Sequence, residues 1–158
     1  MNRIIFSLLF IAFIVVGSHE KSYAQCKQQV VYNCATNNGK AIYLRDFNVK
    51  LKKGGSEDEE SGTKFTVVLN QGTHYRFNLC TQDGFEKSVE LVLFDGKHPE
   101  DTDPYQVTKP SNDPKTDNRF DIICTKSGTY YVSIRFIKGV EGKKSCAVGV
   151  LSFVGKNK

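Results

Sequence analysis

The sequence predicts an all-β protein, built as a two-sheet antiparallel β-sandwich of seven to eight strands. Short runs in which apolar and polar residues alternate recur along the chain, and no long stretch has a helical period. Segments rich in turn-forming residues separate these runs. β-branched and aromatic residues fill the runs, and the chain has seven Tyr and eleven Phe. Strands of this number and length favour two packed sheets, with a closed barrel as the alternative architecture.

The chain begins with the features of a signal peptide. Arg3 precedes the uncharged run of residues 4–16, which is shorter than the stretch of about 20 apolar residues that a membrane-spanning helix needs. Ser22 and Ala24 supply small residues at the −3 and −1 positions of a cleavage site after Ala24. We therefore expect residues 1–24 to be a signal peptide, with an uncleaved anchor as the alternative. Residues 25–158 are then expected to form a single β-sandwich domain without a membrane span.

The first strand of this domain is expected at residues 41–53. Its alternating apolar residues, which slip by one position partway along, are Ile42, Leu44, Phe47, Val49 and Leu51. The slip occurs near Arg45 and Asp46. It predicts a β-bulge or a bend in a long strand.

The same alternation marks six further strands, at residues 64–70, 73–80, 88–94, 119–124, 130–137 and 145–153. The apolar residues of the first five are Phe65, Val67 and Leu69; Tyr75, Phe77 and Leu79; Val89, Leu91 and Leu93; Phe120, Ile122 and Cys124; and Tyr130, Val132, Ile134 and Phe136. The last strand alternates Cys146, Val148 and Val150 against Ala147, Gly149, Leu151 and Phe153. Residues 29–32 are the candidate for a short eighth strand.

Apolar residues occupy both faces of the strand at residues 88–94. Val92 and Phe94 alternate with Leu91 and Leu93. A strand that is apolar on both faces is either central in its sheet or covered by another protein, and we expect burial within this domain.

Two connections differ from the ordinary turns. Residues 54–62 form an acidic loop bounded by glycines, and residues 96–118 contain all four prolines and no convincing strand. A connection as long as the second is usually functional or mobile.

Three segments carry a resemblance to a known family. The order KFTVVLNQGTHYRFNL, SVELVLFDG and RFDIICTKSGTYYVSIRF, followed by a final strand, resembles the bacterial pre-peptidase C-terminal (PPC-like) domain family over residues 64–153. The resemblance implies a jelly-roll-like β-sandwich of the kind appended to secreted peptidases and other exported proteins. This chain departs from the family in having no catalytic domain and in carrying five cysteines. Its leader ending in Tyr-Ala-Gln also resembles those of exported Bacteroidetes proteins.

Five cysteines remain after the predicted cleavage, and in an exported chain they are expected to form disulfides. They are Cys26, Cys34, Cys80, Cys124 and Cys146. No CxxC pair is present, so the signature of a structural zinc site is absent. Cys26 and Cys34 are close enough to close a small N-terminal loop, and a pair among the other three would join neighbouring strands or the two sheets. Spacing leaves the connectivity open, and the odd count leaves one thiol free or joined to another chain.

The residues give no pattern typical of an enzyme, and we expect the protein to have no catalytic activity. Only His74 and His98 remain after cleavage, and neither belongs to an HExxH motif; no Gly-x-Ser-x-Gly motif occurs either. The formal charge of +5 comes from scattered Lys and Arg, so a concentrated nucleic-acid-binding patch is not expected.

Calcium is the one cofactor for which the sequence offers candidate ligands. Asp95, Asp101 and Asp103, together with Glu100, could present several carboxylate oxygens to one cation, and Asp113, Asp117 and Asp121 could complete the site. The acidic run of residues 57–60 is a second candidate. The alternative for both is a solvated acidic loop.

The sequence therefore favours a non-catalytic exported binding or assembly module. The expected role is an accessory subunit of a cell-envelope or secreted protein complex, in the periplasm, at the outer membrane or outside the cell. The expected partner is a protein of the cell envelope, and a glycan is the other possibility. A calcium-stabilised carbohydrate-binding or adhesin-like module is the alternative function.

Overall fold

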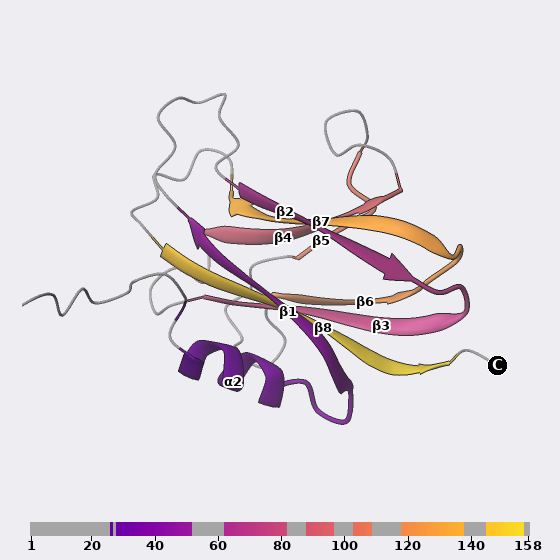
Figure 1. Ribbon diagram of the computed structural model, residues 1–158, viewed down its shortest axis with the longest axis horizontal. Helices are drawn as coiled ribbons and strands as arrows, with labels where there is room; N and C mark the ends of the chain where they lie inside the picture. The colour runs from indigo at the N-terminus through magenta and orange to yellow at the C-terminus, as the bar shows by residue number, and fades with distance from the viewer. Residues whose placement is uncertain are drawn as a thin grey trace, which may run out of the picture.

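The computed structural model describes residue 26 and residues 28–51, 62–81, 88–96, 103–108, 118–137 and 145–156. They form two four-stranded antiparallel sheets that pack face to face (Figure 1). Sheet A has the strand order β1 (Ile42–Leu51), β8 (Ser145–Lys156), β3 (Thr73–Thr81) and β6 (Arg119–Ile123). Sheet B has the order β2 (Gly62–Leu69), β7 (Gly128–Phe136), β4 (Val89–Asp95) and β5 (Gln106–Val107). The predicted two-sheet sandwich is confirmed.

The main core lies between the sheets and is built from the alternating apolar residues of the strands. Most of the predicted apolar residues belong to it, as do Ala147 and Leu151 of β8. Gly149, which lies opposite Phe47 in the β1–β8 ladder, lets the two sheets approach closely at the centre. Val92 and Phe94 are buried as well, at 0% and 3% exposure. The expectation that both faces of β4 are covered is confirmed.

The predicted bulge in β1 is present. The β1–β8 register passes from Tyr43 opposite Ser152 to Arg45 opposite Leu151, so Leu44 is the extra, unpaired residue. The bulge lies one position before the predicted slip. The extra residue keeps Ile42, opposite Phe153, on the same face as Phe47, opposite Gly149. Ile42 and Leu44 are nevertheless exposed, contrary to their expected place in the buried alternation.

The candidate eighth strand at residues 29–32 is wrong, because these residues belong to the helix α2 (Gln28–Thr36). The helix lies against the outer face of sheet A, away from the core (Figure 1). A run of only nine residues, with two half-buried valines facing the sheet, gives little periodicity by which to recognise a helix.

A short strand also lies in the long connection where none was predicted. β5 pairs with Val92 and Leu93 of β4, and the amide of Tyr105 donates to the carbonyl of Leu93 at 2.8 Å. Two paired residues are too few to produce an alternating pattern. The predicted signal peptide and most of the two elaborate loops lie outside the described residues. No helix in the described part of the chain is long and apolar enough to cross a membrane.

Candidate functional site

Two disulfide bonds attach the N-terminal segment to sheet A. Cys26 bonds to Cys146 at the start of β8, and Cys34 in α2 bonds to Cys80 in β3, with Cα–Cα distances of 5.6 and 5.7 Å. The small N-terminal loop considered from the spacing of Cys26 and Cys34 does not form. Both bonds hold α2 on the sheet.

Cys124 is the cysteine without a disulfide, and it is buried at 1% exposure. Its thiol lies 3.6 Å from the hydroxyl of Tyr130 and donates to the carbonyl of Lys126 at 3.2 Å. The Tyr130 hydroxyl donates to the same carbonyl at 3.0 Å. Burial, and then the hydrogen bond with Cys124, raise the pKa of Tyr130. Because the Cys124 thiol is buried, it is not accessible for a disulfide bond with another chain.

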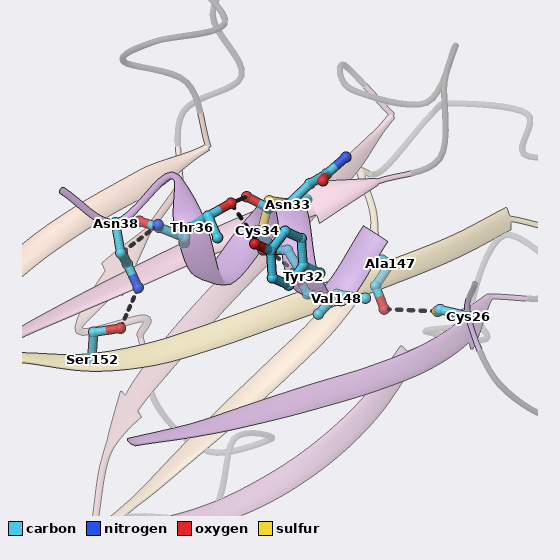
Figure 2. Close-up of a disulfide and its surroundings, with 11 residues drawn as sticks. Cys26, Tyr32, Asn33, Cys34, Thr36, Asn38, Ala147, Val148 and Ser152 are labelled. Atoms are coloured by element: carbon cyan, nitrogen blue, oxygen red, sulfur yellow. Dashed lines mark hydrogen bonds between the residues drawn. A yellow bond between two sulfur atoms is a disulfide. The ribbon is translucent and has the colours of Figure 1, made fainter. Parts of the chain in front are cut away.

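An apolar strip lies beneath α2 on the outer face of sheet A. Val148 and Val150 of β8 are fully buried there, and Val30 and Val31 of the helix pack against them half-buried. Figure 2 shows Val148 beside Cys34, and Cys26 with its sulfur 3.5 Å from the carbonyl oxygen of Ala147. The strip belongs to a second cluster, separate from the core between the sheets.

A polar network fixes the chain just after α2. The Asn38 side chain donates to the hydroxyl of Ser152 on β8 (Figure 2) and accepts from the amide of Asn78 on β3. Arg76 donates to the Asn38 carbonyl at 3.1 Å. Asn38, Asn78 and Ser152 are all buried, and these bonds satisfy the Asn38 side chain and the Asn78 amide nitrogen. The buried Asn78 Oδ1 accepts no hydrogen bond from the described residues.

An ion cluster continues from this network toward the edge strand β6. Arg76 binds the two carboxylate oxygens of Asp121 with its Nε and Nη2, both at 2.7 Å, and His74 Nε2 lies 3.3 Å from the same carboxylate. The hydrogen bond with Arg76 lowers the pKa of Asp121. Asp121, which the sequence offered as a possible further calcium ligand, is paired with Arg76 on the sheet face. The cluster thus joins side chains of two paired strands, because His74 and Arg76 belong to β3 and Asp121 belongs to β6.

The calcium candidates are only partly described. Asp95 is exposed at the end of β4 and Asp103 is exposed shortly before β5, while Asp101 and His98 lie outside the described residues. The described residues contain no group of three or more His, Cys, Asp or Glu that could hold a metal ion. Calcium binding by Asp95, Asp101 and Asp103 stays the alternative that the sequence raised.

The most exposed apolar run that the structure describes lies at the beginning of β1. Ile42, Tyr43 and Leu44 are consecutive, and 61%, 44% and 48% of their surfaces are exposed. We name these three residues the β1 apolar run. β1 is an edge strand of sheet A. The run therefore gives β1 a local apolar surface at its beginning, whereas Phe47, Val49 and Leu51 farther along the strand are buried.

Two residues next to the β1 apolar run, Arg45 and Asp46, form contacts that fix the strand here, and Arg45 places a positive charge beside the run. Arg45 donates to the carbonyl of Thr66 on β2 at 3.2 Å, and its guanidinium lies 5.2 Å from the centre of the Phe47 ring. The Tyr43 hydroxyl donates to Asp46, and this bond raises the pKa of Tyr43 to about 12. Asp46 carries the one carboxylate of β1, and it accepts hydrogen bonds from Tyr43 and Asn48.

Comparison with known proteins finds a similar structure but no related sequence family. No protein family and no curated protein matches the chain. Its structure is similar to PliG of Aeromonas hydrophila, described as a periplasmic lysozyme inhibitor of g-type lysozyme, with a TM-score of 0.54 and 12% sequence identity. The similarity covers 72% of this chain and 88% of the PliG chain. At this identity the likeness shows a shared fold. The PPC-like resemblance stays a prediction, since that structure is described as an inhibitor.

Proposed function

We propose that this chain is a non-catalytic exported module that binds a protein partner through the β1 apolar run. The observation that carries the proposal is the exposure of Ile42, Tyr43 and Leu44 side by side on an edge strand. Large apolar side chains exposed close together often belong to interaction sites, and the central anchors of protein interfaces are often aromatic. Full burial of a Leu or Ile side chain contributes about 1.5–3 kcal/mol, so covering the exposed parts of Ile42 and Leu44 would favour binding.

The charges beside the β1 apolar run indicate the chemistry of the partner. Lys40 precedes the run and Arg45 follows it, and both are exposed. Asp46 is occupied by hydrogen bonds from Tyr43 and Asn48. We infer a partner surface with an apolar centre and acidic groups at its rim, because that arrangement complements the described border.

Two further observations support an exported protein-binding role. Two long-range disulfides are typical of proteins that fold in an oxidising compartment outside the cytoplasm. The similar structure, PliG, is described as a periplasmic inhibitor of g-type lysozyme. A lysozyme is therefore the first partner to test. An accessory subunit of a cell-envelope or secreted complex is the broader form of the proposal.

The experiment compares Leu44→Asp with the matched control Val68→Asp. Val68 is also a strand residue with an apolar side chain, 71% exposed, but it lies in β2 of sheet B. Binding of the disulfide-bonded protein to a g-type lysozyme is measured by surface immobilisation, and lysis of cell walls is followed in parallel. We expect Leu44→Asp to weaken binding by about 10-fold or more, as for loss of an interface anchor, and Val68→Asp to bind as the unchanged protein does.

One result would exclude the first partner to be tested, and another would overturn the proposal. If the unchanged protein neither binds the lysozyme nor slows lysis, the lysozyme is the wrong partner, and the same pair of variants is then applied to proteins that co-purify from the native envelope. Equal recovery of every co-purifying protein by Leu44→Asp and by the unchanged chain would show that the β1 apolar run is not the binding surface.

A further inference from the structure

We propose that the two disulfides form a redox-controlled site, at which a dithiol reductant releases α2 and uncovers the apolar strip on the outer face of sheet A. Both bonds attach one short segment to two neighbouring strands, Cys26 to β8 and Cys34 to β3. The bonds do not cross the core between the sheets. They hold a cover onto the outside of an otherwise complete sandwich (Figure 1).

The helix has little other means of staying in place. It has nine residues, whereas isolated helices shorter than about 12–15 residues are marginal in water. Its first turn has no acidic residue and its last turn no basic residue, so no side-chain charge supports its dipole. Cys34 is its one fully buried residue, and Val30 and Val31 are only half-buried. The packing of α2 therefore depends on the covalent bonds.

The surface beneath the helix is distinct from the main core. Val148 and Val150 are 0% exposed, and their cluster comprises the four bonded cysteines and the two helix valines. The core between the sheets draws on the opposite faces of the same strands, including Ala147 and Leu151 of β8. Departure of α2 therefore exposes the strip without opening the sandwich.

The helix segment remains tied at one end when the bonds are broken. Asn38 keeps its hydrogen bonds to Ser152, Asn78 and Arg76. Gly39 follows with a φ of 63°, a conformation that glycine adopts without steric cost. The helix then swings away about Asn37, which joins its end at Thr36 to the anchored Asn38.

In each disulfide the more exposed residue is the one on the sheet. Cys80 and Cys146 are half-buried, while Cys34 and Cys26 are 0% and 6% exposed. A thiolate of the reductant attacks the Cys80 sulfur, the disulfide breaks, and Cys34 leaves as a thiolate that takes up a proton. The second thiol of the reductant resolves the mixed disulfide and frees the Cys80 thiol. Each bond takes two electrons and two protons, the reductant becomes a disulfide, and the same steps at Cys146 free Cys26.

The test treats the exported, disulfide-bonded protein with dithiothreitol and follows hydrogen exchange of backbone amides together with binding of a hydrophobic dye. We expect exchange in α2 to accelerate by about 100-fold on reduction, the scale set by loss of a long-range disulfide. Exchange in β7 should change little, and dye fluorescence should rise. In the reduced state, the variant Val148→Ser should show a smaller dye signal because it removes part of the strip.

Double cysteine substitutions show which of the two disulfides contributes more to holding α2 on the sheet. Cys34→Ser with Cys80→Ser frees the middle of the helix, and Cys26→Ser with Cys146→Ser frees the chain before it; we expect the first pair to accelerate exchange in α2 more. Unchanged protection of α2 after complete reduction would overturn the proposal. So would equal loss of protection in α2 and β7, because the helix would then be an inseparable part of the sandwich.

Discussion

Replacement of Gly149 by alanine tests the central packing of the two sheets. A Cβ at this position would lie 2.9 Å from Ile134 Cδ1, 3.0 Å from Leu91 Cδ1 and 3.2 Å from Phe47 Cδ2. All three neighbours are at most 1% exposed. Overpacking a closed core costs about 1–3 kcal/mol, and reduced freedom of the unfolded chain returns about 0.4–1 kcal/mol. We expect Gly149→Ala to lower the free energy of unfolding by about 1–2 kcal/mol.

Urea unfolding followed by tyrosine fluorescence measures this change. With a denaturant dependence of about 2 kcal/mol per molar, the midpoint should fall by about 0.5–1 M. The matched control is Gly155→Ala in the same strand, where an added Cβ meets nothing within 4 Å. Equal midpoints for the two variants would refute the close approach of the sheets at Gly149.

A compensating substitution makes the test more specific. Ile134→Val removes the methyl group that lies nearest to the added Cβ, and alone it should cost about 0.5–1.5 kcal/mol. In the double variant with Gly149→Ala the two losses should not add, because the second change makes room for the first. Strict additivity would indicate that the strain arises elsewhere.

Three further predictions concern charge, thiol and metal. Because Arg76 holds the pKa of Asp121 below its ordinary value of 3.8, their ion pair contributes stability above that pH and loses it as the pH falls through the folded-state pKa; the difference in urea midpoint between the unchanged protein and Asp121→Asn should therefore shrink in acid. The Cys124 thiol should resist a thiol reagent in the native protein and react once the chain is unfolded without reductant, whereas a disulfide-linked dimer on a non-reducing gel would contradict its burial. Millimolar calcium should leave the melting temperature unchanged; a rise that is abolished by Asp95→Asn with Asp103→Asn would favour the calcium-stabilised alternative.

The strands were predictable because most have one buried face and one more polar face, which places apolar residues at alternate positions in the sequence. Phe77, Leu91 and Val132 alternate with other residues at the strand period, and all three are buried between the sheets. The bulge in β1 left a trace in the same pattern, as a slip of one residue. Its consequence was not predictable, because the exposure of Ile42 and Leu44 depends on where the strand lies in its sheet.

The segments that were missed draw their structure from distant partners. α2 is held on sheet A by bonds from Cys34 to Cys80 and from Cys26 to Cys146, and β5 is defined by its pairing with β4. Neither leaves a local periodicity. His74 and Asp121 are likewise 47 positions apart in the sequence numbering, and only the pairing of β3 with β6 places them together.

The linear order of residues determines the β class, the number of main strands and the supply of cysteines, because these follow from side-chain alternation and composition within short windows. Contacts between remote segments decide which cysteines bond, which face of sheet A is covered, and which apolar residues stay in contact with water. The physical reason is that burial and disulfide bonding depend on distance in space, and in an antiparallel sandwich neighbouring strands are often far apart along the chain.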